Sequence, residues 1–170
     1  MMPAFFAEIV MRLRFLLPVF ILAFGGVAYA ADPLPPAKPL PHTSVIIDAA
    51  NGPAKFDVEI AGDWRSQEYG LMNRKSLPKS GGMLFDFHSP VMTSFWMKNT
   101  LIPLDMIFIR QDGRVSSVTA DAVPMSLTSI PSIEPIRAVL EIDGGESLKL
   151  GIYPGQKVHA AIFAQGAKTH

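Results

Sequence analysis

Residues 94–99 place an aromatic ring, a cation and an amide close together in the sequence. If this segment forms a strand, alternate side chains point to opposite faces, so Trp96 and Lys98 lie on the same side. An indole ring beside an ammonium group, with the Asn99 amide nearby, suits a sugar ring or a small anionic ligand. In the structural alternative, Trp96 packs on the domain and Lys98 extends its charge into water.

Arg74, Asp105 and Glu141 are the other charged side chains that could take part in a site. Asp105 and Glu141 each stand between apolar neighbours. Either faces solvent or, if buried, needs a partner, for which Arg74 and Lys98 are the candidates. Two carboxylates on separate strands could also perform acid–base chemistry. Arg74 could instead bind an anion or compensate the negative end of a helix.

Patterns typical of metal sites and activated nucleophiles do not occur in the sequence. There are no cysteines, and the four histidines show neither HxxxH nor HExxH spacing, which argues against a zinc-hydrolase site. No GxSxG, phosphate-loop or dinucleotide-binding glycine motif follows a strand-like segment. Methionines between residues 72 and 125 could bind Cu(I), but core packing explains them better. We expect neither a metal nor a cofactor.

The overall composition favours one globular domain. The chain has 170 residues, of which 49% are hydrophobic and 18% charged, and 15 basic side chains balance 15 acidic ones. Such a chain is too apolar for disorder and of a length for one domain rather than two. Its balanced charge provides no global basic field, so we expect no nucleic-acid partner.

Residues 1–30 have the features of a secretory signal peptide. Arg12 and Arg14 precede an apolar run, and residues 28–30 show the small-x-small pattern of a cleavage site. We predict cleavage after Ala30 and export to the periplasm or the extracellular space, with no membrane span remaining. The alternative is an N-terminal membrane anchor, because the apolar run is at the short end of the lengths that span a bilayer.

A proline-rich segment, residues 31–43, separates this leader from the domain. Its five prolines favour an extended, polyproline-like spacer. The single folded domain is then expected over residues 44–170.

Turn signals divide this domain into short strands. We predict a mainly β fold, a sandwich or jelly-roll-like barrel with one short helix at about 64–73, capped by Asp63, and a helical turn near 146–150. The expected strands are a hairpin over 44–61 and the segments 83–87, 93–98, 104–110, 114–120, 137–142 and 157–163.

Several motifs together resemble one known family. They are YGLMNR at 69–74, LP at 77–78, GMLF at 82–85, SFWMKNT at 94–100, PLD at 103–105, VLE at 139–141 and a glycine at 145. In this order and spacing the sequence resembles the DUF192 family, also called UPF0127. The resemblance implies a β-sandwich, jelly-roll-like domain and an exported or envelope-associated protein, without established catalytic residues. Many members carry acidic residues where this sequence has 79–82, KSGG, which weakens the idea of a metal-binding loop there.

Three functions remain open from the sequence. The first is a non-catalytic envelope domain that binds a small anionic or glycan-like ligand near six residues: Arg74, Trp96, Lys98, Asn99, Asp105 and Glu141. The second is an enzyme that acts on envelope material through Asp105 or Glu141. The third is a module that binds another envelope protein. All site predictions assume that these side chains converge in space.

Overall fold

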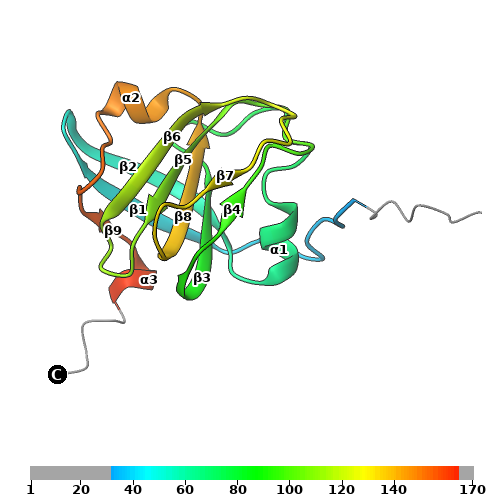
Figure 1. Ribbon diagram of the computed structural model, residues 1–170, viewed down its shortest axis with the longest axis horizontal. Coiled ribbons are helices and arrows are strands. Elements are labelled where there is room, and N and C mark those ends of the chain that lie inside the picture. The colour runs from blue at the N-terminus through cyan, green and yellow to red at the C-terminus, as the bar shows by residue number, and fades with distance from the viewer. Residues whose placement is uncertain (1–31, 165–170) are drawn as a thin grey trace, which may run out of the picture. The chain divides into compact units, whose positions relative to one another are not determined.

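The computed structural model describes residues 32–164, so the predicted signal peptide lies outside the described residues. Most of the described chain forms one curled, seven-stranded sheet with short helices at its margins (Figure 1). The elements are β1 (His42–Ala49), β2 (Gly52–Ala61), α1 (Trp64–Tyr69), β3 (Met83–Val91), β4 (Ser94–Phe95), β5 (Leu104–Ile109), β6 (Val115–Ala122), β7 (Ile130–Pro131), β8 (Ile136–Asp143), α2 (Glu146–Leu150), β9 (Val158–His159) and α3 (Ala161–Ala164).

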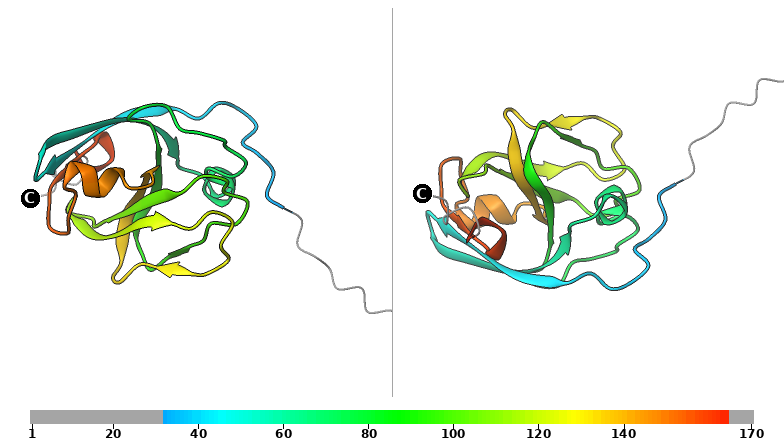
Figure 2. Two further views of the ribbon diagram at one scale, coloured as in Figure 1. Left: turned by 90° about the horizontal axis from the view of Figure 1, so that it is seen from above. Right: turned by 90° about the horizontal axis from the view of Figure 1, so that it is seen from below.

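The strand order is β6-β5-β8-β3-β2-β1-β9, and β4 and β7 form a separate two-stranded ribbon. The sheet curls until its two ends meet, where Arg114 and Lys157 form an antiparallel bridge. The amide of Val158 donates to the carbonyl of Gly113 at 2.8 Å across this seam. Figure 2 shows the strands curving round in both views. The predicted mainly β fold with barrel-like closure is therefore confirmed.

Local sequence signals explain the first hairpin. Positions 54, 56 and 58 of β2 are buried and the intervening positions are exposed, as alternation in a half-buried strand requires. β1 pairs with β2 in register up to Ala49 and Gly52. Gly52 has a φ of 109°, a conformation that side chains disfavour, and the turn therefore falls at this glycine.

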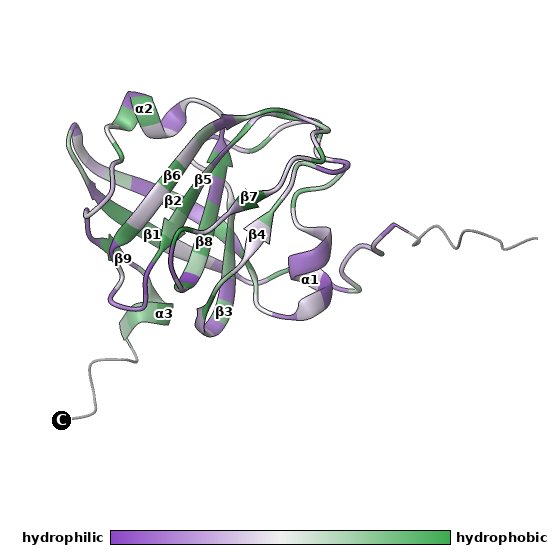
Figure 3. Cartoon of the chain, in the orientation of Figure 1, coloured by the Kyte–Doolittle hydropathy of each residue, from purple (hydrophilic) through white to green (hydrophobic). Residues whose placement is uncertain are grey.

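Opposite faces of the central strands contribute to two apolar clusters. Leu84, Leu140 and Ile107 lie side by side on β3, β8 and β5 and belong to the first cluster. Their sequence neighbours, among them Phe85 and Val139, belong to the second. The second cluster is covered by segments that follow α1 and β4 rather than by strands of the sheet. Figure 3 shows the hydrophobic colouring in the sheet and a largely hydrophilic α1.

Three predicted elements are shorter than expected. Helix α1 ends at Tyr69 because Gly70 takes up a positive φ of 50°, which leaves the helical conformation. The strand predicted at 93–98 is limited to β4, and the one predicted at 157–163 divides into β9 and α3. The Asp63 cap is confirmed, since its Oδ1 atom accepts from the Ser66 amide at 2.9 Å. The helical turn at 146–150 is confirmed as α2.

The C-terminal end of the proline-rich spacer lies against the domain. The carbonyl of Pro41 accepts a hydrogen bond from the amide of Ile60 at 2.8 Å. Leu40 packs against the second apolar cluster. Within residues 32–164, none of the helices combines the length and the apolar character needed to cross a membrane.

Candidate functional site

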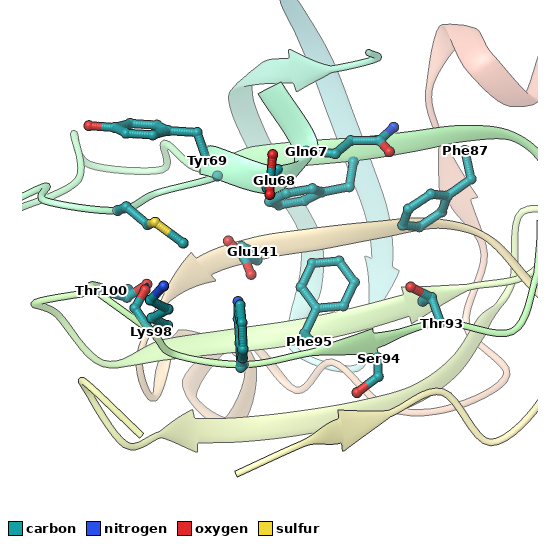
Figure 4. A pocket seen from close by; sticks show the side chains of 14 residues that line it. Gln67, Glu68, Tyr69, Phe87, Thr93, Ser94, Phe95, Lys98, Thr100 and Glu141 are labelled. Carbon is teal, nitrogen blue, oxygen red and sulfur yellow. The ribbon is translucent and has the colours of Figure 1, made fainter. Parts of the chain in front are cut away.

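A cavity of about 340 Å³ opens between α1, the 93–100 segment and the outer face of β3 and β8. We call it the Glu141 pocket. Figure 4 shows the Glu141 side chain at its centre, with Lys98 and Thr100 to one side and Phe95 to the other. Its walls comprise Gln67, Glu68, Tyr69, Gly70, Met72, Phe85, Phe87, Thr93, Ser94, Phe95, Trp96, Lys98, Thr100 and Glu141.

One wall of the Glu141 pocket is aromatic. The ring of Phe95 meets the rings of Phe85, Phe108 and Phe87 edge-on, with centroid distances of 5.0, 6.1 and 6.4 Å. These contacts fix Phe95, because edge-to-face aromatic pairs have a preferred geometry. Trp96 follows it in the chain and is half-exposed. The pocket therefore offers rigid aromatic surface next to an indole that a ligand can reach.

Helix α1 forms the opposite wall and is fastened to the sheet. Nε2 of Gln67 donates to the carbonyl of Asp86 at 2.8 Å, which joins the helix to β3. The Asp86 side chain pairs with Arg137 of β8. Glu68 and Tyr69 of the same helix also line the pocket. The wall is thus held by its own polar contacts as well as by packing.

Glu141 is buried at the base of the pocket, with 4% of its surface exposed. Its Cα partners on the neighbouring strands are Met83 and Met106. Among residues 32–164, no hydrogen bond to its carboxyl group occurs. Burial raises the pKa of Glu141 to about 8, so the group is mostly protonated at pH 7. A protonated carboxyl can donate one hydrogen bond and accept others.

Lys98 lies at the rim of the pocket, in contact with Trp96. Its Nζ atom is 5.6 Å from the centroid of the Trp96 ring, within the range of a cation–π interaction. The same Nζ atom is 2.8 Å from Oδ1 of Asp32. A hydrogen bond from Lys98 is the main cause that lowers the pKa of Asp32, and the side chain of Asn99 adds to it. The predicted proximity of ring, cation and amide is therefore found.

The strict alternation predicted for residues 94–99 is wrong beyond β4. Phe95 lines the same pocket as Trp96 and Lys98, although alternation would point it away from them. The reason is that the strand ends at Phe95, so the alternation of a strand does not extend to the residues that follow. Met97 is fully buried in the second apolar cluster.

Arg74 lies outside the Glu141 pocket. Its guanidinium binds Glu59 with two hydrogen bonds, at 2.8 and 2.5 Å. The expected pairing with Asp105 or Glu141 is therefore wrong. Arg74 lines a neighbouring cavity of about 360 Å³ together with spacer residues 36–40. Tyr69 and Gly70 border both cavities, so the two lie on either side of the end of α1.

Asp105 is also separate from the pocket and has a structural role. Its carboxylate accepts backbone hydrogen bonds from Asp121, Gly145 and Ser147 at 2.7, 2.9 and 2.7 Å. The prediction that a buried Asp105 needs Arg74 or Lys98 as a partner is wrong, because amides satisfy it. Asp105 pairs in register with Ile142, one position beyond Glu141, and so faces the other side of the sheet.

Three of the six predicted residues, Trp96, Lys98 and Glu141, therefore line one pocket, with Asn99 beside them. Sequence reasoning missed Glu68 and Gln67, which a capped helix after Asp63 could have suggested as a polar wall. It also missed Asp32, for which no local pattern existed. Among residues 32–164, no group of three or more His, Asp or Glu side chains is placed to hold a metal ion.

The family model of DUF192, "Uncharacterized ACR", matches residues 45–160. The chain belongs to the DUF192 family. The matched range contains the Trp96, Lys98 and Glu141 positions but ends short of the spacer. Asp32 therefore lies outside the part of the chain that defines the family.

Two solved structures resemble this DUF192 chain. One, from Sinorhizobium meliloti 1021 and described provisionally as a transcription regulator, is 38% identical with a TM-score of 0.71, over 75% of this chain and 99% of that one. The other, a protein of unknown function from Novosphingobium aromaticivorans, is 42% identical with a TM-score of 0.70, over 76% and 93% of the two chains. No curated protein matches the chain.

Proposed function

We propose that this DUF192 chain is an exported, non-catalytic domain that binds a small ligand in the Glu141 pocket. The observation that carries this proposal is the burial of the Glu141 carboxyl at the base of a cavity, with no hydrogen bond from the described residues. Its oxygens are not among the fully enclosed, unpartnered side-chain atoms of residues 32–164, so they open into the cavity, where a ligand can reach them. A methionine, like its neighbours at 83 and 106, would fill this position without a carboxyl that has lost most of its water. A ligand atom that bonds to Glu141 explains why the carboxyl is present.

The side chains around Glu141 indicate the chemistry of the ligand. Trp96 and Phe95 provide aromatic surface, while Lys98 provides a positive charge at the rim. Gln67, Thr93 and Thr100 add hydrogen-bonding groups. Aromatic surface with a few directed polar groups is typical of small-molecule sites. The arrangement supports a small anionic or glycan-like ligand.

Export is part of the proposal and rests on the sequence. The charged start, apolar run and small-x-small site of residues 1–30 favour a cleaved signal peptide. The periplasm or the extracellular space is the proposed location. An envelope glycan or an organic anion would be available to the pocket there.

Ligand-induced stabilisation tests the proposal. Protein purified after expression of the full chain is heated with a panel of sugars, peptidoglycan fragments, organic anions, nucleotides and divalent metals. A ligand at a hundred times its Kd should add roughly 2.7 kcal/mol of stability. Trp96→Ala and Lys98→Ala should lose the effect while remaining folded. Lys75→Ala, at an exposed lysine that does not line the pocket, is the control.

A second candidate function is an enzyme that acts on envelope material. The observation that favours it is the raised pKa of Glu141, since a carboxyl that is protonated at neutral pH can serve as a general acid. Asp105 is committed to backbone amides, whereas Glu68 lines the same pocket. Turnover of a peptidoglycan fragment that is lost in Glu141→Gln would favour this function over simple binding.

A module that binds another envelope protein is the third candidate. Val123, Leu127 and Ile133 expose 68%, 68% and 71% of their surface in the loop on either side of β7. Exposed apolar residues that gather in one region often belong to interfaces. If no small ligand stabilises the protein, cross-linking in the envelope, compared between wild type and Leu127→Ser, tests this alternative.

A further inference from the structure

The contact between Asp32 and Lys98 joins the start of the spacer to the rim of the Glu141 pocket. Nζ of Lys98 holds the Asp32 carboxylate at 2.8 Å while lying 5.6 Å from the centre of the Trp96 ring. A carboxylate supplied by the chain itself thus contacts the cation at the rim of the pocket. Asp32 is only two residues beyond the predicted cleavage site.

This contact is weak and easily exchanged. The Asp32 side chain is 67% exposed, whereas that of Lys98 is 27% exposed. Exposed ion pairs contribute little stability, because water and salt screen them. Asp32 also lies outside the range that matches the family model, whereas Lys98 lies within it. The cation therefore belongs to the domain, and the spacer carboxylate is an addition that another carboxylate can replace.

The remaining walls indicate what such a carboxylate would be attached to. A sugar ring presents an apolar face and a rim of hydroxyl groups. Trp96 and Phe95 match the first, while Gln67, Thr100 and Glu141 match the second. Gln67 and Thr100 already donate to backbone carbonyls, so their oxygens remain as acceptors for hydroxyl groups. A purely aromatic acid would leave Glu141 without a hydrogen-bond partner, which is unfavourable in a buried site. The cavity, at about 340 Å³, is at the small end of the range for ligand sites, as suits a single ring.

Resting on the proposed function, we infer that the Glu141 pocket binds an acidic sugar, a pyranose ring that carries a carboxylate, and that Asp32 competes with this carboxylate for Lys98. The ring stacks on Trp96, its carboxylate binds Lys98, and a ring hydroxyl bonds to Glu141. The spacer then lowers the apparent affinity of the pocket by occupying the cation. Without the Asp32 charge, Lys98 is free in every molecule. The apparent affinity for the acidic sugar then rises by a factor of 1/f, where f is the fraction of wild-type molecules in which Lys98 is free.

Tryptophan fluorescence provides the test, because the chain has only two tryptophans. Trp64 is 75% exposed and does not line the pocket, so Trp64→Phe leaves Trp96 as the reporter. Glucuronate, glucose and acetate are titrated into protein purified after expression of the full chain. We compare this background with added Asp32→Asn, Asp32→Ala and Lys98→Ala. Asp57→Asn, a change at an exposed aspartate of β2, is the charge-matched control.

The expected result is that glucuronate binds more tightly than glucose and that acetate binds far more weakly than either. Both Asp32 variants should bind glucuronate severalfold more tightly, whereas glucose binding stays constant and Asp57→Asn changes neither. Lys98→Ala should lose the preference for glucuronate, about tenfold or more if one charge-assisted hydrogen bond is removed.

The inference is overturned if the Asp32 variants leave glucuronate binding unchanged, or if acetate binds as well as glucuronate. In either case the pocket still binds small ligands and the proposed function stands. If no member of the wider panel binds to wild type or to either Asp32 variant, the proposed function fails together with the inference.

Discussion

The backbone at Gly82 lies so close to the carbonyl oxygen of Glu141 that a Cβ atom at position 82 would overlap this oxygen. Gly82 directly precedes β3, whose first residue, Met83, pairs with Glu141 of β8. The glycine therefore allows β3 to enter the sheet beside the residue at the base of the pocket. Because the obstructing atom belongs to the backbone, a side chain at position 82 has no flexible group to push aside.

Gly82→Ala should therefore destabilise the fold and disturb the pocket. Overpacking of this kind typically costs about 1–3 kcal/mol, measured here by urea denaturation. Gly62→Ala is the matched control, since its Cβ atom would lie 3.8 Å from Ile60 and 3.9 Å from His88, at ordinary contact distances. That control should change stability by no more than about 0.5 kcal/mol. Equal effects of the two substitutions would contradict this role of Gly82.

The parts of the fold that could be predicted from the sequence are those with local causes. Alternation in β2, the Asp63 cap and the short turn between the predicted strands 104–110 and 114–120 are all encoded within a few residues. The end of α1 at Tyr69 was missed, although Gly70 offered a signal for it. Strand order and closure at the Arg114–Lys157 bridge depend on contacts distant in sequence, which no local pattern contains.

The site could be predicted only in part for the same reason. Trp96 and Lys98 are two residues apart, so their proximity follows from local geometry. Whether the side chains of Asp105 and Glu141 lie on the same face of the sheet depends on the register between β5 and β8. A shift of one position would move the Asp105 side chain to the other face. Asp105 and Glu141 look alike in sequence, with apolar neighbours on both sides. In the structure one carboxylate is satisfied by amides, and the other is in a pocket.

Asp105→Asn should destabilise the fold more than substitution of an exposed aspartate. The carboxylate accepts three backbone hydrogen bonds at full burial, and an amide group would direct its own N–H donors towards these amides. A hydrogen bond to a charged group is typically worth about 1.5–3 kcal/mol, and Asp105→Asn weakens three of them. Chemical denaturation measures the loss, and Asp143→Asn at the exposed end of β8 is the control. Similar stabilities for the two variants would show that Asp105 does not anchor α2.

The stability of the protein should fall as pH rises from about 4.5 to about 8, because of Glu141. Burial raises the pKa of this carboxyl from 4.5 to about 8, so between these values the folded state binds a proton that the unfolded state has released. The favourable contribution is complete below 4.5 and is lost as pH rises through about 8. Its slope is roughly 1.4 kcal/mol per pH unit.

Urea denaturation of wild type and Glu141→Gln over this pH range isolates the effect. Glutamine does not titrate, so the difference between the two proteins removes the contributions of the histidines and other groups. The variant should gain stability relative to wild type as the pH rises. A pH-independent difference would mean that Glu141 is already ionised in the folded protein, which would also remove the basis for a protonated donor in the pocket.

Glu141→Met should make the protein more stable and less able to bind. The substituted side chain would lie beside Met83 and Met106, in an apolar layer that has no described partner for a carboxyl. Removal of a carboxyl that burial has stripped of most of its water recovers up to about 3 kcal/mol, observed as a higher midpoint in urea at pH 7. Ligand-induced stabilisation should be lost at the same time. The opposite result, a loss of stability in Glu141→Met, would contradict a role in binding. It would mean that Glu141 stabilises the fold more than a methionine does at the same position.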